Sequence, residues 1–458
     1  MTSISMKSRA YLLLVRTMLG LVLTISPSLA QSVYTPYTFT TLSYARIFQS
    51  FPSGIAVDSA NKLYMTDTNN TIWELQPAGT NWTVTILAGL AGDGYLNYGT
   101  NDGTGSAAQF KFPQGIAVDS ATNIYVADTF NHTIRKISFM KPPIGPLEWM
   151  VTTLAGLGGS NGTNDGTGSA ARFDYPTGIA VDKAGNLYVA DSGNDTIRQV
   201  TPVGTNWMVT TLAGLADVSG TNDGMGSGAR FNSPFGVVVD GAINLYVTDS
   251  GNDTIRKMTL IGTNWMVTTL AGTAGISGNA DGMGSNALFY HPTSIAADGM
   301  TNIYITDSGN YIIRKIASSG VVTTLAGHPH DPLAFYDENG TGSAAGFEGL
   351  KGVTVDTNGN VYVADMFDFF IRKGYPENVP AVINSSGTGF GFTNSQFGFT
   401  LTAPAGQLVV VETSTDLLNW LPIWTNAFPG VGTAESSLVF SDPQSDVYSN
   451  RFYRARTP

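Results

Sequence analysis

Two short apolar runs, each ending in aspartate, follow one another in six places along the chain. In the third place they cover residues 178–182 and 186–191, and polar turn residues separate them. Short β-branched runs between Gly, Asn and Asp are typical of β-strands. Two further runs, at 196–200 and 207–214, complete the unit. The pattern therefore predicts four strands per repeat.

The aspartate that ends the second run marks the repeat, and successive copies lie 61, 63, 58, 58 and 58 residues apart. A period of this size indicates a repeat architecture, because one unit cannot bury its apolar face without neighbours. Four strands repeated six times predict an all-β, six-bladed β-propeller. The six aspartates, to which we assign a structural role in the repeat, are Asp67, Asp128, Asp191, Asp249, Asp307 and Asp365.

The two ends of the repeat array complement each other. The sixth unit ends with its third strand, at 370–373, and a segment matching the missing fourth strand precedes the first unit, at 38–43. We therefore predict that the N-terminal strand completes the last blade. Such closure removes two exposed sheet edges and joins the ring without a covalent link.

The repeats resemble the NHL-repeat family of β-propellers. The resemblance rests on the motifs at 176–182, 186–191 and 131–136, and it covers residues 38–373. It implies the propeller fold already predicted from the strand pattern. Three blades depart from the motif: Trp73-Glu74 replaces Ile-Arg in the first, Ser294 replaces Gly in the fifth, and Leu350 replaces Pro in the sixth.

Composition narrows the function classes. Charged residues make up 12% of the chain and glycines number 53, which suits a turn-rich all-β protein. The net charge of −11 argues against nucleic-acid binding, which needs basic patches to replace counterions. The absence of cysteine means that ring closure, and not disulfides, must supply constraint, and it fits a bacterial exported protein.

Residues 1–30 are expected to be a signal peptide. Lys7 and Arg9 precede an apolar stretch at 11–23 that only Arg16 and Thr17 interrupt, and Ser28-Leu29-Ala30 offers small residues for cleavage. A membrane anchor is the alternative, but the stretch is shorter than the ~20 apolar residues that span a bilayer. We expect a secreted, periplasmic or cell-surface protein with no membrane span after cleavage.

The repeat pattern ends near residue 373, so the propeller is assigned to 31–373. Residues 374–395 are rich in Gly, Ser, Asn and Pro and are expected to form a linker. About five strands follow within 396–458 and predict a small β-sandwich-like domain. This segment resembles a module found at the ends of modular exported bacterial proteins.

Two kinds of connection are expected on one face of the propeller, which we call the long-loop face. One is the long segment between a fourth strand and the next blade, such as 158–173, and the other is the turn at 191–195. Loops gathered on one face of a rigid scaffold commonly carry recognition. In the long segments we expect a Ser to cap one helical turn that buries a Phe four residues on. The aromatic residues concerned are Phe110, Phe173, Phe231, Phe289 and Phe347.

The aspartates of the turn after the second strand have two interpretations. Carboxylate oxygens are ligands for Ca²⁺, but Asp also closes turns by binding its own backbone, and we expect this second role. A recurring arginine seven residues on is expected to pair with these carboxylates at blade junctions. The arginines are Arg135, Arg198, Arg256, Arg314 and Arg372.

One loop departs from the Gly-rich pattern of the others and is our candidate ligand-binding site. It contains two His, three carboxylates and two aromatic side chains, and exposed aromatics beside charges are common interface anchors. These residues are His328, His330, Asp331, Phe335, Tyr336, Asp337 and Glu338. Zinc sites need three or four clustered ligands, and we expect the loop to be solvated without a metal.

We therefore expect a monomeric, exported, non-enzymatic propeller that needs no cofactor and binds a protein, peptide or glycan on its long-loop face. Two alternatives stay open. The first is a metal-dependent lyase or hydrolase with its site at the channel mouth, which the family resemblance implies as a possibility. The second is a purely structural cell-surface module. Fold alone does not decide between them.

Overall fold

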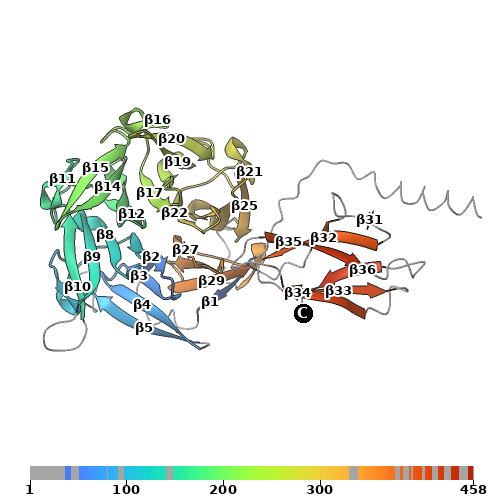
Figure 1. Cartoon of the computed structure of the whole chain (residues 1–458). Helices are drawn as coiled ribbons and strands as arrows, with labels where there is room; N and C mark the ends of the chain where they lie inside the picture. The colour runs from blue at the N-terminus through green and yellow to red at the C-terminus, as the bar shows by residue number, and fades with distance from the viewer. Residues whose placement is uncertain are drawn as a thin grey trace, which may run out of the picture. The chain divides into compact units, whose positions relative to one another are not determined.

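Six antiparallel sheets follow one another along the chain and form the six blades of a propeller (Figure 1). The computed structural model describes residues 37–42, 51–79, 81–90, 97–140, 148–329 and 339–376, and within the C-terminal part 382–384, 391–393, 396–404, 408–414, 421–427, 435–442 and 452–456. The predicted signal peptide at 1–30 lies outside the described residues. In the part that is described, no helix has the length and apolarity needed to cross a membrane.

Each blade contains four main strands, as the repeat pattern predicts. Blade 1 contains β2 (Pro52–Val57), β3 (Leu63–Asp67), β4 (Ile72–Ala78) and β5 (Asn81–Ala88). Blade 2 contains β7 (Ile116–Val118), β8 (Ile124–Asp128), β9 (Thr133–Met140) and β10 (Glu148–Ala155). Blade 3 contains β12 (Pro176–Val181), β13 (Leu187–Asp191), β14 (Thr196–Val203) and β15 (Asn206–Ala213).

The remaining blades repeat this arrangement. Blade 4 contains β17 (Pro234–Val239), β18 (Leu245–Asp249), β19 (Thr254–Ile261) and β20 (Asn264–Ala271). Blade 5 contains β22 (Pro292–Ala297), β23 (Ile303–Asp307), β24 (Ile312–Ile316) and β25 (Val321–Ala326). Blade 6 contains β27 (Leu350–Val355), β28 (Val361–Asp365), β29 (Phe370–Pro376) and the N-terminal strand β1 (Tyr37–Thr41).

The N-terminal strand closes the ring, which confirms the predicted closure. β1 pairs antiparallel with β29, with Phe39 opposite Gly374 and Thr41 opposite Arg372. The first strands of successive blades contact one another, and β27 contacts β2, so these strands surround a central channel.

The long connections add a fifth strand that the sequence pattern did not predict. Before entering its blade, each connection pairs with that blade's outermost strand, as β11 does with β15. The connection therefore runs along the outer edge of a blade before it enters the first strand of that same blade. The added strands are β6 (Gly103–Thr104), β11 (Gly166–Thr167), β16 (Gly224–Met225), β21 (Gly282–Met283) and β26 (Gly340–Thr341).

A single 3-10 turn follows each of these short strands, and the five phenylalanines after it are buried, as expected. The expected Ser cap is wrong. In η4 (Gly168–Ala170) the N-cap is Thr167, its side chain makes no capping hydrogen bond, and Ser169 lies inside the turn. The other turns are η2 (Gly105–Ala107), η6 (Gly226–Gly228), η8 (Gly284–Asn286) and η10 (Gly342–Ala344).

The hydrophobic core lies between adjacent blades. Between blades 2 and 3, for example, Tyr125 and Ala127 pack against Phe173 and Leu187. All four side chains are at most 3% exposed. A blade therefore buries its apolar faces only in the presence of its neighbours, which is the property that the repeat spacing predicted.

Glycine near the start of a first strand lets neighbouring first strands approach closely. A Cβ on Gly178 would lie 2.5 Å from the Phe235 carbonyl oxygen and 2.8 Å from the Cα of Gly236. Ser294 occupies this position in blade 5, and its hydroxyl accepts a hydrogen bond from the Val353 N–H (3.1 Å). The departure from the repeat motif thus adds a bond between blades 5 and 6.

We predict that Gly178→Ala lowers the free energy of unfolding by about 1–3 kcal/mol, because the new methyl group meets the backbone of the next blade. Gly241→Ala is the matched control, since a Cβ there would have no atom within 4 Å. Urea unfolding of both variants checks this expectation. Equal stability of the two variants would contradict the close approach.

The C-terminal part contains strands at all five expected positions. They are β32 (Gln396–Pro404), β33 (Leu408–Ser414), β34 (Leu421–Ala427), β35 (Glu435–Asp442) and β36 (Phe452–Arg456). One sheet contains β32 and β35, the other contains β33, β34 and β36, and Tyr453 of the second contacts Phe399 and Phe440 of the first.

The expected linker differs from the structure in two respects. Strand β29 extends to Pro376, and β30 (Val382–Asn384) and β31 (Gly391–Thr393) lie inside 374–395 and pair with β32. The boundary between the propeller and the C-terminal domain stays a prediction.

Candidate functional site

A buried arginine ties each long connection to the blade that follows it. In blade 3, Arg198 donates from Nη1 to Asp191 Oδ2 and from Nη2 to Asp165 Oδ1, both at 2.7 Å. The same guanidinium donates to the carbonyl oxygens of Arg172 and Asn164, both at 3.0 Å. Its Cζ lies 5.2 Å from the centre of the Phe173 ring. We call this arrangement the arginine hub.

The hub recurs around Arg135, Arg256 and Arg314, each of which bonds two aspartates in the same way. Blade 6 differs because Asn339 replaces the exposed aspartate, and its Oδ1 accepts from Arg372 Nη2 at 3.3 Å. Blade 1 has Trp73 in the place of the arginine, and its indole N–H donates to Asp67 Oδ2 at 2.7 Å. The expected Arg–Asp pairing is confirmed, but each pair joins the second and third strands of one blade and does not lie at a junction between blades.

The expected turn role holds in blade 1, where Asp67 Oδ1 accepts the Thr71 N–H (2.9 Å), but the aspartates that pair with arginine do not close their own turns in this way. Asp191 Oδ1 accepts from the Asp174 N–H, 17 residues earlier (2.7 Å), and Oδ2 accepts from Asn194 as well as from Arg198. Burial raises the pKa of Asp191 to about 6, while Arg198 and the other donors oppose the rise. The carboxylates are therefore structural, and their oxygens are used within the blade.

The turn role belongs to the aspartate that ends the first apolar run. Asp182 Oδ1 accepts from the backbone N–H groups of Ala184 and Asn186, and Oδ2 accepts from the Tyr188 hydroxyl. Side-chain to backbone bonds of this kind are a common way to close a turn between strands. The same bonds recur at the equivalent aspartates of the other blades.

A second set of bonds links neighbouring blades at the long-loop end of the channel. Tyr175, which precedes Pro176, has φ of 46°, and its N–H donates to His132 Nδ1 of the previous blade (3.1 Å). Ser233 has φ of 48° and donates in the same way to Asp195 Oδ1 (2.7 Å). A side-chain-bearing residue in this left-handed region is uncommon and costs energy. The inter-blade bond offsets part of that cost and fixes the side chains at the channel mouth.

Several aromatic side chains surround this mouth. Phe130 and Phe367 are 38% and 57% exposed, and each occupies the middle of the turn after a second strand. Three other blades have Gly193, Gly251 or Gly309 there. These aromatic residues are therefore not needed for the repeat fold, and they are exposed where function is expected.

The aromatic side chains contact one another across blade junctions. Phe130 lies between Phe112 and Tyr175, with ring centres 5.2 and 5.1 Å away. Phe367 of blade 6 lies 6.2 Å from Phe51 of blade 1. We call the set the aromatic rim, and it consists of Phe51, Phe112, Phe130, Tyr175 and Phe367.

The candidate loop from the sequence is described only at its start. His328 follows β25, whereas His330, Asp331, Phe335, Tyr336, Asp337 and Glu338 lie outside the described residues. Within the described residues, no group of three His, Cys, Asp or Glu side chains is placed to hold a metal ion. Sequence reasoning missed the aromatic rim, although alignment of the repeats would have revealed Phe130 and Phe367 against Gly.

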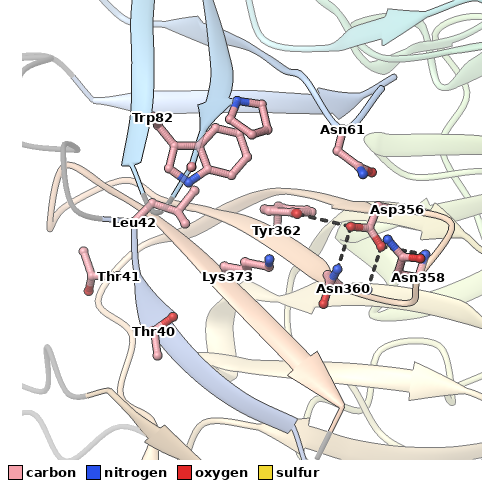
Figure 2. A pocket seen from close by; sticks show the side chains of 12 residues that line it. Thr40, Thr41, Leu42, Asn61, Trp82, Asp356, Asn358, Asn360, Tyr362 and Lys373 are labelled. Atoms are coloured by element: carbon pink, nitrogen blue, oxygen red, sulfur yellow. Dashed lines mark hydrogen bonds between the residues drawn. The ribbon is translucent and has the colours of Figure 1, made fainter. Parts of the chain in front are cut away.

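A cleft of about 410 Å³ lies on the opposite face, between blades 6 and 1 (Figure 2). Trp82 and Tyr362 lie with ring centres 6.3 Å apart, and Lys373 Nζ lies 5.6 Å from the Tyr362 ring centre. Asp356 accepts hydrogen bonds from Tyr362 and Asn360. The same Tyr–Trp contact packs blade 2 against 3 and blade 3 against 4, so these side chains serve blade packing.

Comparison with known proteins agrees with the geometry. The NHL repeat family model matches residues 110–137 and 173–199, which contain the buried Arg–Asp pairs Arg135–Asp128 and Arg198–Asp191. The chain therefore contains NHL repeats within a β-propeller. This NHL propeller is 29% identical over 342 residues to Protein SUPPRESSOR OF QUENCHING 1, chloroplastic, of Arabidopsis thaliana, covering 70% of the chain and 30% of that protein.

It is also 28% identical over 315 residues to NHL repeat-containing protein 2 of Bos taurus, covering 60% of the chain and 40% of that protein. The NHL propeller thus spans less than half the length of these relatives. A solved structure of an auxiliary nutrient binding protein from Bacteroides ovatus has a TM-score of 0.52 at 15% identity, covering 74% of this chain and 77% of that one. At that identity the likeness concerns the fold.

Proposed function

We propose that this NHL propeller is an exported, non-enzymatic scaffold that binds a protein or peptide through the aromatic rim. The observation that carries the proposal is the exposure of Phe130 and Phe367 at positions where three sister blades have glycine. Aromatic side chains supply large contact area at low entropic cost and are frequent interface anchors. Export rests on the signal-like residues 1–30.

Two features favour a rigid recognition surface over a mobile one. Bonds between neighbouring blades hold the backbone below the rim, as the Tyr175 N–H bond to His132 illustrates. The side chains also support one another through edge-to-face contacts, such as the one between Phe130 and Tyr175. A preorganised surface loses less entropy when it binds.

The test uses the double variant Phe130→Ala with Phe367→Ala and a random peptide library displayed on phage. We expect peptides selected on the wild-type protein to bind the double variant at least about tenfold more weakly, with an unchanged thermal midpoint. Phe139→Ala is the matched control, because Phe139 is also exposed (53%) but lies near the opposite end of blade 2.

Equal binding of the selected peptides to the wild type and both variants would refute the rim as the site. Phe335 and Tyr336 would then be the better candidates, and their double alanine variant would be tested with the same peptides. Failure to select any peptide above background would contradict the proposal as a whole. Stoichiometric metal in the purified protein would instead favour the metal-dependent lyase or hydrolase.

A further inference from the structure

The first strand segment of each blade faces the central channel and begins with Pro or, in blade 6, Leu. We compare the residue that directly follows this Pro or Leu in the six blades. Among these six described residues, five are uncharged and one is a lysine. They are Ser53, Gln114, Thr177, Phe235, Thr293 and Lys351.

The Lys351 side chain lies inside the channel. Its Nζ is 5.3 Å from the centre of the Phe235 ring. Lys351 belongs to blade 6 and Phe235 to blade 4, and β22 of blade 5 lies between β17 and β27. A contact between blades that are not neighbours requires the side chain to extend across the channel.

No described residue provides an anionic or hydrogen-bonding partner for the Lys351 ammonium. Burial lowers the pKa of Lys351, and no neighbouring charge acts against the shift. The Phe235 ring stabilises the cation through its negative face, but a ring quadrupole does not replace a counter-ion.

We infer that the channel is an anion-binding site, in which the Lys351 ammonium binds one oxygen of a carboxylate or phosphate group above the Phe235 ring. The ligand would be a small molecule or a terminal group with a single such head, because Lys351 is the one cation among the six described channel positions that were compared. This inference does not depend on the aromatic rim, which involves different side chains.

The test compares thermal midpoints in acetate, phosphate and chloride at equal ionic strength. We expect acetate or phosphate to raise the midpoint of the wild-type protein above that in chloride, and the two salts distinguish a carboxylate from a phosphate ligand. Lys351→Met should lose the part of the rise that comes from anion binding and keep only the general stabilisation by excluded salts. In chloride it should melt at a higher temperature because an unpaired, partly buried charge is gone. Lys351→Arg should retain the rise.

Lys257→Met is the matched control, because Lys257 Nζ also lies over an aromatic ring (Tyr246, 5.7 Å) but on β19, away from the channel. It should behave as the wild type does. A shift as large in Lys351→Met as in the wild type, or a wild-type midpoint equal in all three salts, would overturn the inference. If Lys351→Met does not fold, the Lys351 pKa is measured in the wild-type protein by ¹⁵N NMR of its lysine side chains, with and without the anion. Binding must raise this pKa, and an unchanged pKa refutes binding.

Discussion

Replacing Arg256 by methionine should lower the free energy of unfolding by about 3–5 kcal/mol, because it leaves the fully buried Asp249 carboxylate without its cation. The wild-type distance from Arg256 Nη1 to Asp249 Oδ2 is 2.7 Å. The change also removes donors to the Arg230 and Asn222 carbonyl oxygens. Urea unfolding followed by circular dichroism measures the loss.

The hub offers its own controls. Asp223, the second carboxylate on Arg256, has a side chain that is 49% exposed, so Asp223→Asn should cost about 1 kcal/mol or less. The double variant Arg256→Met with Asp249→Asn should recover part of the loss, since it removes both buried charges together. If the single variant Arg256→Met were as stable as Asp223→Asn, the buried Arg256–Asp249 pair would contribute nothing to the free energy of unfolding.

Deleting residues 31–45 from a chain that lacks residues 1–30 should cost more than about 5 kcal/mol and is expected to abolish cooperative folding. The deletion removes β1, which leaves the edge of β29 unpaired. It also removes the buried side chains of Tyr37, Phe39 and Leu42. Losing Phe39 alone corresponds to about 3–5 kcal/mol.

Other contacts of β1 also stabilise the closed ring. The Tyr37 hydroxyl donates to the Gly359 carbonyl oxygen (2.9 Å), and the Phe39 ring packs edge-on against Phe347 with ring centres 5.3 Å apart. A shorter deletion of residues 31–36 leaves β1 whole and is the control. Equal thermal midpoints for the two deletions would contradict the closing role of β1.

The strand pattern predicted the propeller well because burial in each blade depends on short local runs. The second strand of every blade is fully buried, and it coincides with the apolar run that defined the repeat. Ring closure was also predictable, since one strand was missing at one end and present in surplus at the other. Boundaries such as the extension of β29 to Pro376 depend on pairing with β1, which the local sequence does not contain.

The second half of the arginine hub was not predictable. Arg198 bonds Asp165, 33 residues earlier and in the connection between blades, and only the folded path of that connection brings the two together. The Ser cap was predicted from a local preference, but the turn begins two residues earlier, with Thr167 and not Ser169 as its N-cap, directly after the pairing of β11 with β15. Lys351 stands out only when the six channel positions are compared with one another.

The ring is joined by hydrogen bonds between the third and fourth strands of blade 6. The same kind of strand pair could join the ring in another blade if the chain were opened elsewhere. The third and fourth strands of blades 3 and 4 meet in tight, exposed hairpins at 203–206 and 261–264. A rearrangement that moved the ends of the coding sequence to either hairpin would leave every arginine hub within one continuous stretch of chain. The position at which the propeller ring is opened is therefore one of several equivalent choices, and circularly permuted versions of the propeller are expected to fold.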